Sequence, residues 1–495
     1  MFSQITALTH CSSSAQHHRR TLAGEECAFC NSAVTILCER RIATLKSHEN
    51  GAVVKRVATA RRPTTSARRR RGIPAALAIS MSAGLIAACT SEPQLSATST
   101  SPGTSTSSTA AQFTTAAHST PPSTATAAPA PAPSATTSVA PRGPGRLIGD
   151  GSTSDTGPQP NQPVPSRLKP GERPPQFVVV SWDGAGEGAS KLFTRWRAFA
   201  AAKNVPMTFF VTGLYFLPAS ARTAYTPPGR AAGASDIPLF PERAVHATIE
   251  QIGKAWLEGH EIGTHFNGHF CGPKGGASWT PAQWDQEIAQ AKKFVTTWRT
   301  TTGFTDLPPL PFDYEKELVG SRTPCLEGQA GLVASTAVKT WRYDSSATGT
   351  QVWPRKLAGS HLWNIPLQSI PLAGRSVLSM DYNFYAVQSK AKNGDPAMYA
   401  VWEAEVRDGY LAGFRRAYNG NRAPLIIGNH FENWNGGIYM SGLEKALTEM
   451  VGQPDVRFVT FKQLCDWLDA QDPQVLAALQ KLPLGTAPAG GWAHL

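Results

Sequence analysis

The sequence predicts an α/β fold, a single distorted (β/α) barrel of about seven parallel strands. Residues 176–182, QFVVVSW, form a continuous apolar run, which is typical of a strand buried on both faces of a sheet. From about residue 174 onward, such runs alternate with segments whose apolar residues recur at helical spacing. Polar residues that can carry chemistry follow the ends of several strands, where barrels of this kind hold their sites. We therefore predict one folded domain at residues 171–485.

The predicted strands and helices follow one another in a regular order along this domain. The strands are predicted at residues 176–182, 207–212, 261–265, 319–322, 341–345, 425–430 and 456–460. One helix is expected to begin near Leu192 and another near Val245, each with its apolar residues on one face. Thr280 and Gln283, with Pro281 at the first helical position, form a capping box that predicts the start of a third helix.

The positive charge of the chain is concentrated at its N-terminus. The formal net charge is +12, but residues 1–72 hold 13 of the 47 Lys and Arg and only 4 of the 35 Asp and Glu. The remaining residues therefore carry a net charge of only +3. Because the basic residues belong to the leader and not to the folded domain, we infer no nucleic-acid partner.

Residues 61–89 are predicted to be an export signal. Four arginines at 68–71 precede a mildly apolar run at 73–88, and small residues precede Cys89. The run is too short and too rich in alanine to span a membrane comfortably. Because its end resembles a bacterial lipobox, we expect Cys89 to carry a lipid that anchors the protein outside the cytoplasmic membrane. The alternative is a plain signal peptide that is cut nearby and leaves Cys89 unmodified.

The segments on either side of this signal are not expected to fold. Residues 1–60 lack a long apolar periodicity and precede the export signal, so we interpret them as a mis-assigned N-terminal extension. Residues 90–170 are rich in Ser, Thr, Pro and Ala and cannot bury enough apolar surface to offset the entropy of ordering them. They are predicted to be a disordered linker between the anchor and the domain.

Two histidines, His265 and His269, are candidate metal ligands. On one helical turn their spacing of four residues places both imidazoles on the same face, within reach of one cation. The spacing alone is weak support, because two polar loop histidines without a ligand satisfy it as well. The other polar residues at predicted strand ends are Asp183, Arg322, Asp344 and His430. So many polar residues at one end of a barrel favour a common site over separate loop roles.

The motifs SWDG, MTFFVTG, THFNGH, SRTP, WRYDSS and IIGNH follow in this order between residues 176 and 469. Together they resemble the polysaccharide deacetylase family, the NodB-homology domain of carbohydrate esterase family 4. The resemblance implies a distorted (β/α) barrel and a divalent metal ion, which we expect to be zinc, bound by Asp-His-His. It also implies hydrolytic removal of N-acetyl groups from sugars.

By matching position, the resemblance gives each motif residue a role. His265 and His269 would be metal ligands, and Arg322 would orient the catalytic carboxylate. Asp344 would lie behind the site and tune a neighbour, and His430 would be the general acid that protonates the leaving amine. A metal-activated water, a carboxylate base and a histidine acid are what amide hydrolysis requires.

The first motif departs from the family pattern, because it holds one aspartate where the family has two. In one register Asp183 is the catalytic base and Gly184 takes the place of the metal ligand. In the other, Asp183 is the ligand and Trp182 takes the place of the base. Strand alternation favours the first register, and the need for an anionic ligand favours the second. Glu187 is the nearest carboxylate that would fill the missing role, unless it is a solvated residue at the start of a helix.

Three further residues are linked to the predicted site by their positions. Cys271 and Cys325 each follow a site motif, and outside the cytoplasm they are expected to form a disulfide or to remain two separate thiols. Trp434, shortly after His430, is a candidate for stacking on a sugar ring, with core packing as the alternative.

The sequence therefore predicts a metal-dependent hydrolase that removes N-acetyl groups from a cell-envelope polysaccharide or peptidoglycan. The alternative is a non-catalytic lipoprotein that keeps the fold and binds glycan or another wall component. In both cases the partner is a glycan, the lipid is the only expected membrane contact, and no partner chain is inferred.

Overall fold

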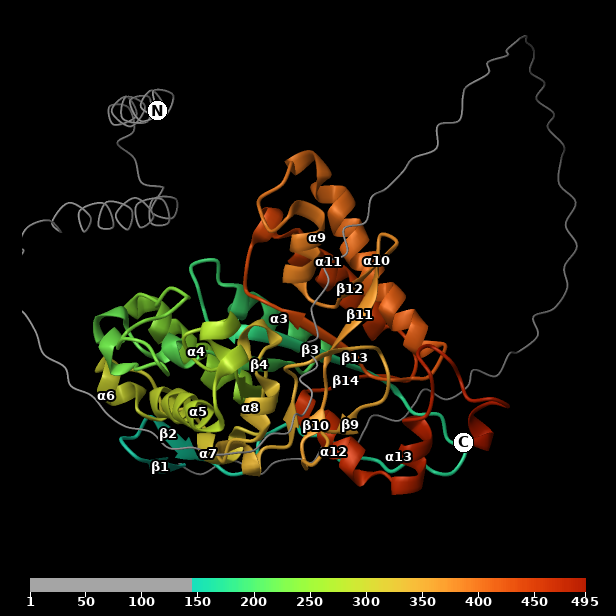
Figure 1. Ribbon diagram of the computed structural model, residues 1–495, viewed down its shortest axis with the longest axis horizontal. Coiled ribbons are helices and arrows are strands. Elements are labelled where there is room, and N and C mark those ends of the chain that lie inside the picture. Colours follow the sequence, from blue (N-terminus) through green and yellow to red (C-terminus); the bar gives the residue numbers. More distant parts are fainter. Residues whose placement is uncertain (1–144) are drawn as a thin grey trace, which may run out of the picture. The chain divides into compact units, whose positions relative to one another are not determined.

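The computed structural model describes residues 145–495 (Figure 1). The predicted N-terminal extension at 1–60, the export signal at 61–89 with Cys89, and most of the linker at 90–170 lie outside these residues. No helix among residues 145–495 combines the length and the hydropathy needed to cross a bilayer.

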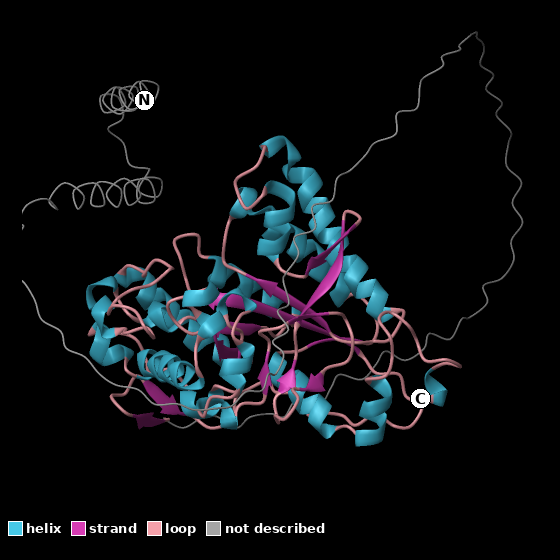
Figure 2. Cartoon of the chain, in the orientation of Figure 1, coloured by secondary structure: helices cyan, strands magenta, loops and turns pink. Residues whose placement is uncertain are grey.

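A nine-stranded sheet forms the centre of the domain, with strands in magenta between the cyan helices in Figure 2. Its strand order is β13-β3-β4-β5-β6-β7-β10-β9, and β14 also pairs with β3. The strands are β3 (Gln176–Ala185), β4 (Thr208–Val211), β5 (Glu261–Thr264), β6 (Gly320–Ser321), β7 (Tyr343–Asp344), β9 (Arg355–Lys356), β10 (Trp363–Asn364), β13 (Leu425–Asn429) and β14 (Val456–Phe458). All pairings are parallel except that between β9 and β10. The predicted distorted (β/α) barrel of NodB type is confirmed, and all seven predicted strands form.

The continuous apolar run of β3 has a direct physical cause. Val178, Val180 and Trp182 point into a large core shared with the helices, whereas Phe177 and Val179 point into a second, smaller core. Both sets are buried, so neither face of the strand is polar. The alternation continues to the end of the strand, where successive residues reach opposite faces of the sheet.

The helices cover the sheet where the sequence predicts them. They are α3 (Leu192–Lys203), α4 (Glu242–Leu257), α5 (Pro281–Thr296), α6 (Trp298–Thr302), α7 (Tyr314–Glu317), α8 (Gln329–Val333), α9 (Asp381–Ser389), α10 (Tyr399–Tyr418), α11 (Trp434–Val451), α12 (Phe461–Ala470) and α13 (Pro473–Leu479). The predicted capping box at the start of α5 is present, with Thr280 and Gln283 bonding each other's backbone N–H groups. Thr460 and Gln463 form the same arrangement at the start of α12.

A second, smaller sheet was not predicted. It has the order β12-β11-β8, with β8 (Thr348–Gly349), β11 (Leu367–Leu372) and β12 (Arg375–Leu378). Figure 1 shows β11 and β12 beside α9, α10 and α11, in the orange part of the chain. A bridge between Met380 and Gly428 joins this region to β13, so it is held close to the end of a central strand.

The predicted boundary of the domain is wrong at its N-terminal side. Strands β1 (Arg146–Ile148) and β2 (Thr153–Asp155) form a hairpin inside the segment that was expected to be linker. Ser154 N–H donates to the carbonyl of Leu310 at 2.8 Å, and the Trp298 indole donates to the carbonyl of Ser152 at 2.8 Å. The composition was misleading because hydrogen bonds of backbone and side-chain groups, and not large apolar side chains of the hairpin, attach it.

Candidate active site

Four polar residues lie at the carboxyl ends of neighbouring parallel strands. Asp183 is near the end of β3, and His430 follows β13, its neighbour in the sheet. His265 directly follows β5, and Arg322 directly follows β6, which pairs with β5. Because these strands are parallel, their carboxyl ends meet at the same edge, and the four side chains are directed to one region.

Asp183 and Arg322 form a buried ion pair. Arg322 Nη1 donates to Asp183 Oδ1 at 2.6 Å, and the two side chains are 0% and 3% exposed for Arg322 and Asp183 respectively. The guanidinium also donates to Ser181 Oγ at 2.8 Å and to Ser345 Oγ at 2.9 Å. Burial alone would raise the pKa of Asp183, but the charge and hydrogen bond of Arg322, together with His265 and His430, hold that pKa below its ordinary value. Asp183 is therefore a carboxylate at neutral pH.

Trp182 and Asp183 lie on opposite faces of β3. The Trp182 ring stacks on Phe431 with ring centroids 4.5 Å apart and packs against Trp196, and its N–H points to Met207 Sδ at 3.2 Å. The indole is fully buried in the large core, away from Arg322. Gly184, with a φ of +63°, offers no side chain.

Glu187 has a structural task at the start of α3. Its Oε2 accepts hydrogen bonds from the backbone N–H of Thr194 at 3.0 Å and from the Thr194 hydroxyl. The side chain is buried and satisfies a free N–H in the first turn of the helix. Glu187 is therefore a residue that caps the start of a helix, but its side chain is buried and not solvated as expected.

The tautomer of His265 is fixed by the backbone of Arg322. His265 Nδ1 lies 2.8 Å from the Arg322 carbonyl oxygen, which only accepts, so Nδ1 carries the proton and Nε2 keeps its lone pair. Burial lowers the pKa of His265 to about 3, so the ring is neutral at neutral pH. A neutral imidazole that donates its other N–H to a carbonyl is the usual state of a metal-ligating histidine.

His269 lies beside His265, with ring centroids 5.3 Å apart. Burial also lowers the pKa of His269. Two neutral imidazoles at this separation fit a borderline divalent cation such as zinc. The three donor groups Asp183, His265 and His269 do not all lie within 4.8 Å of one another.

Among residues 145–495, the group of three ligand-type atoms within 4.8 Å of one another is His269, Cys271 and Cys325. The two sulfur atoms of this group are bonded to each other, with Cα atoms 6.1 Å apart, and are not available as thiolates. The disulfide connects the loop after β5 to the loop after β6, that is, the loops that carry His269 and Arg322.

His430 is bound by Asp381, a residue that the sequence analysis did not identify. His430 Nδ1 lies 2.8 Å from Asp381 Oδ1, and the His430 backbone N–H donates to Asp381 Oδ2 at 2.7 Å. Burial would lower the pKa of His430, but the charge and hydrogen bond of Asp381, with the charges of Asp183 and Glu432, together raise that pKa above its ordinary value. Asp381 begins α9 just after β12, and this place after a strand is the signal that could have identified it.

Asp344 lies behind this site and contacts neither Arg322 nor His430 through a hydrogen bond in the described structure. Its carboxylate accepts from Ser321 Oγ at 3.2 Å, from Gln329 at 2.7 Å and from Ser346 Oγ at 2.7 Å. Burial raises the pKa of Asp344. It therefore holds the ends of β6 and β7 together.

Trp434 is part of an aromatic surface next to His430. Its ring stacks on Tyr385 with centroids 5.0 Å apart, and meets the edge of Tyr382 at 5.6 Å. The Trp434 and His430 centroids are 5.5 Å apart. Tyr382 is 46% exposed and Trp434 is partly exposed, so this surface is open to a ligand.

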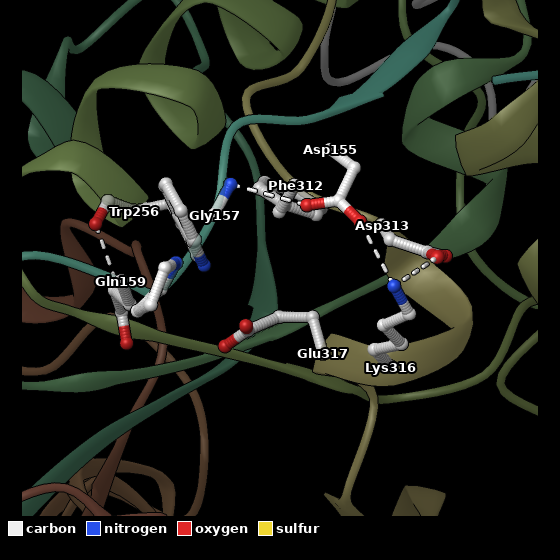
Figure 3. Close-up of a pocket in the computed structure, with 9 residues that line it drawn as sticks. Asp155, Gly157, Gln159, Trp256, Phe312, Asp313, Lys316 and Glu317 are labelled. Atoms are coloured by element: carbon white, nitrogen blue, oxygen red, sulfur yellow. Dashed lines mark hydrogen bonds and ion pairs between the residues drawn. The ribbon is translucent and has the colours of Figure 1, made fainter. Parts of the chain in front are cut away.

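A cavity of about 340 Å³ lies elsewhere, at the amino ends of the strands (Figure 3). Trp256 lies near the end of α4, shortly before β5 begins, and Glu317 lies shortly before β6. Both lining residues are therefore at the ends of the strands opposite to the ends that carry the candidate site. Its lining residues are Asp155, Gly157, Pro158, Gln159, Trp256, Phe312, Asp313, Lys316 and Glu317. None of the predicted site residues is among them.

The fold and the strand-end residues thus define a distorted (β/α) barrel with polar residues at the carboxyl ends of its strands. Among solved structures, the chain is similar to a Mycobacterium smegmatis protein assigned to the polysaccharide deacetylases. The identity is 17% over 66% of this chain and 99% of that chain, with a TM-score of 0.38. It is also similar to a family 4 acetyl xylan esterase from Clostridium thermocellum in complex with a cobalt ion, at 16% identity, 61% and 96% coverage and a TM-score of 0.29.

Puue allantoinase is similar as well, at 14% identity, 62% and 95% coverage and a TM-score of 0.36. No family model and no curated protein matches the sequence. Because these structures have different activities and low identities, the likeness concerns the fold alone. The activity is therefore argued from the residues of the site.

Proposed function

We propose that the protein is a metal-dependent hydrolase that removes N-acetyl groups from a polysaccharide or peptidoglycan of the cell envelope. The observation that carries this proposal is the gathering of an acid, a base and two neutral imidazoles at one edge of the sheet. Arg322 helps to lower the pKa of Asp183 and Asp381 helps to raise the pKa of His430, which are the directions that a base and an acid require.

His265 and His269 would hold the cation. When bound, a divalent cation lowers the pKa of a water molecule and polarises an acetyl carbonyl. His265 is suited to this role because its Nδ1–H is already engaged with a backbone carbonyl, which leaves Nε2 for the ion.

Asp183 is proposed as the general base. Its position opposite Trp182 and its pairing with Arg322 match the register in which the single aspartate of the SWDG motif is the base. As a carboxylate, it accepts the proton of the attacking water. Arg322 keeps it ionised and fixes its orientation through Oδ1.

His430 is proposed as the general acid. Once water has added to the acetyl carbon, the C–N bond breaks only if the nitrogen leaves as a neutral amine, so a proton must reach it. His430 supplies that proton, and Asp381 stabilises the protonated imidazole and fixes the ring. Asp381 is therefore a positioning residue.

The neighbouring aromatic surface supports a sugar substrate. The rings of Tyr382 and Trp434 are partly exposed, and their centroids lie 6.5 Å and 5.5 Å from the centroid of the His430 ring. Aromatic faces stack on the apolar faces of sugar rings, so we place the sugar next to the acetylated unit here.

The place of action is proposed to be outside the cytoplasmic membrane. The disulfide between Cys271 and Cys325 is compatible with an oxidising compartment. A lipid on Cys89 would anchor the chain there, and the segment up to residue 144 would separate the anchor from the domain.

The test is acetate release from N-acetylglucosamine oligomers and from peptidoglycan. The purified protein should release acetate, a chelator should stop the release, and zinc or cobalt should restore it. His430→Ala should abolish release, whereas His246→Ala, a helix histidine paired with Asp306 on the surface, should not. If acetate is absent with every metal and substrate, the proposal is wrong.

A second function is favoured by one observation, the glycine at position 184 in place of a second aspartate. A chain that cannot complete its metal site would be a glycan-binding lipoprotein with the same fold. Measurable binding of N-acetylglucosamine oligomers, together with no acetate release, would favour this second function.

A further inference from the structure

The disulfide next to the candidate active site belongs to a cluster of three metal-binding side chains, those of His269, Cys271 and Cys325. Among residues 145–495 their ligand atoms all lie within 4.8 Å of one another. His269 Nδ1 lies 3.8 Å from Cys271 Sγ. Cys325 is exposed and the other two side chains are partly exposed, so a cation from solvent can reach the cluster.

Two loops form this cluster, one after β5 and one after β6, and the two strands are neighbours in the sheet. The loops contact each other apart from the disulfide. Gly272 N–H donates to Glu327 Oε2 at 2.6 Å. The backbones also pack closely, because a Cβ atom added at Gly328 would lie 2.1 Å from the carbonyl oxygen of Gly276. These contacts keep the loops together when the bond between the sulfur atoms is broken.

The separation of the imidazole and the nearer sulfur fits a zinc ion. Zinc binds thiolate sulfur at about 2.3 Å and imidazole nitrogen at about 2.0–2.1 Å in tetrahedral geometry. Those bonds place a sulfur and a nitrogen about 3.6 Å apart, close to the 3.8 Å between Cys271 Sγ and His269 Nδ1. Two thiolates and one imidazole are an established ligand set for zinc, with the fourth position left to water.

The disulfide keeps this site closed. In tetrahedral geometry the two sulfur ligands lie about 3.8 Å apart as thiolates, which atoms bonded to each other cannot do. Two electrons and two protons break the bond and give two thiols, and a dithiol reductant that supplies them becomes a disulfide itself. Rotation of the exposed Cys325 side chain then separates the sulfur atoms. Each thiol releases its proton to solvent when it binds the cation.

We propose that reduction of the bond between Cys271 and Cys325 creates a zinc site that consists of both thiolates and His269. A neutral imidazole has one nitrogen with a free lone pair, so His269 binds one cation at a time. Zinc held by the thiolates therefore removes His269 from the pair with His265. This consequence rests on the proposed function, in which both histidines hold the catalytic cation, whereas the thiolate site does not.

The test uses cobalt(II) in place of zinc, because its absorption spectrum reports its ligands. Thiolate bound to cobalt(II) gives a sulfur-to-metal charge-transfer band in the near ultraviolet, which nitrogen and oxygen ligands do not give. The full chain is titrated with cobalt(II) before and after treatment with a phosphine, which reduces the disulfide, becomes a phosphine oxide and adds no thiol. We expect a charge-transfer band that appears on reduction.

Variants assign the band to the cluster. Cys271→Ser combined with Cys325→Ser keeps the other six of the eight cysteines, buried Cys465 among them, and measures their contribution. The unaltered protein should exceed that contribution by one cobalt per chain. His269→Gln should weaken binding of this cobalt by more than ~100-fold, because a direct ligand contributes more than the ~10–100-fold of its outer partners. His246→Gln, on the surface, should not. Equal bands in the unaltered protein and the double variant, or unchanged affinity in His269→Gln, would overturn the inference.

Alkylation gives the same assignment without a variant. The reduced protein is treated with iodoacetamide with and without cobalt(II), and the modified cysteines are identified by peptide mapping. The cation should protect Cys271 and Cys325 from alkylation, because a metal-bound thiolate is not free to react. Full alkylation of both cysteines in the presence of cobalt(II) would contradict the proposed site.

The outcomes separate this inference from the proposed function. If the oxidised protein releases acetate but reduction adds no band above that of the double variant, the inference alone fails. If the band appears and the oxidised protein releases no acetate from any substrate, the proposed function alone fails. With one zinc per chain, reduction should lower acetate release by the unaltered protein more than by the double variant. An equal fall in both proteins would contradict the capture of His269.

Discussion

Arg322→Met removes the positive half of the buried ion pair and keeps a side chain of similar length. Asp183, 3% exposed, then loses the partner that stabilises its charge. Breaking a buried pair by removing one member costs about 3–5 kcal/mol, because the remaining charge is left without compensation. For a domain of this size that corresponds to a fall in the unfolding midpoint of roughly 4–7 °C at neutral pH.

The loss should depend on pH in a defined direction. In the unaltered protein the folded-state pKa of Asp183 is below its ordinary value, so the pair adds stability above that ordinary value and loses it as pH falls through the folded pKa. In Arg322→Met, the raising effect of burial on the pKa of Asp183 is opposed only by His265 and His430, so that pKa rises and the variant is destabilised as pH rises. The difference between the two proteins is therefore largest at neutral pH and shrinks on acidification.

The assay is thermal unfolding of both proteins across the acid and neutral range, with acetate release measured alongside. Arg415→Met is the control, because Arg415 and Glu449 form an exposed pair, 57% and 44% exposed, that should contribute at most about 1 kcal/mol. Equal midpoints for Arg322→Met and the unaltered protein at neutral pH, or a difference that persists in acid, would refute the reasoning.

Three other predictions concern single features. Asp381→Asn should move the alkaline limb of the pH profile of kcat to lower pH, because the carboxylate raises the pKa of His430; an unmoved limb contradicts this role. Burial raises the pKa of Glu287 from 4.5 to about 7, so the unaltered protein should lose stability as pH rises between these values. The Glu287→Gln variant should not show this loss when the thermal midpoints of both proteins are measured against pH. Parallel curves for the two proteins would contradict the prediction. Replacing Cys271 and Cys325 by serine should lower the unfolding free energy in denaturant by about 4 kcal/mol, because the bond closes a 54-residue separation; no change would mean that the bond does not form.

The parts of the fold that the sequence predicted are those with strong local signals. The run at 176–182 is apolar because β3 has a core on each face, and Thr280 with Gln283 caps α5 through contacts three residues apart. Strands β8, β9 and β10 have two residues each and carry no periodicity to detect. The hairpin at 146–155 is attached by hydrogen bonds of backbone and side-chain groups, which composition does not reveal.

The sequence predicted those residues of the candidate site that lie at the end of a strand. Asp183, His265, Arg322 and His430 lie at strand ends as expected, and Asp183 and Trp182 lie on opposite faces of β3. Their partners were harder to predict, because pairs such as Asp381 and His430 are 49 residues apart in the sequence. Asp344 is buried with serine and glutamine partners and contacts no charged site residue, a distinction that only the packing provides.

Arg322 contacts two residues of the candidate site through two different groups, its side-chain guanidinium and its main-chain carbonyl. Its guanidinium contacts Asp183, whereas its main-chain oxygen accepts a hydrogen bond from the Nδ1–H of His265. Every amino acid retains that oxygen, so mutagenesis at position 322 can disable one neighbour and leave the other intact. Variants there should uncouple proton abstraction from ion retention, which few other positions in the barrel allow.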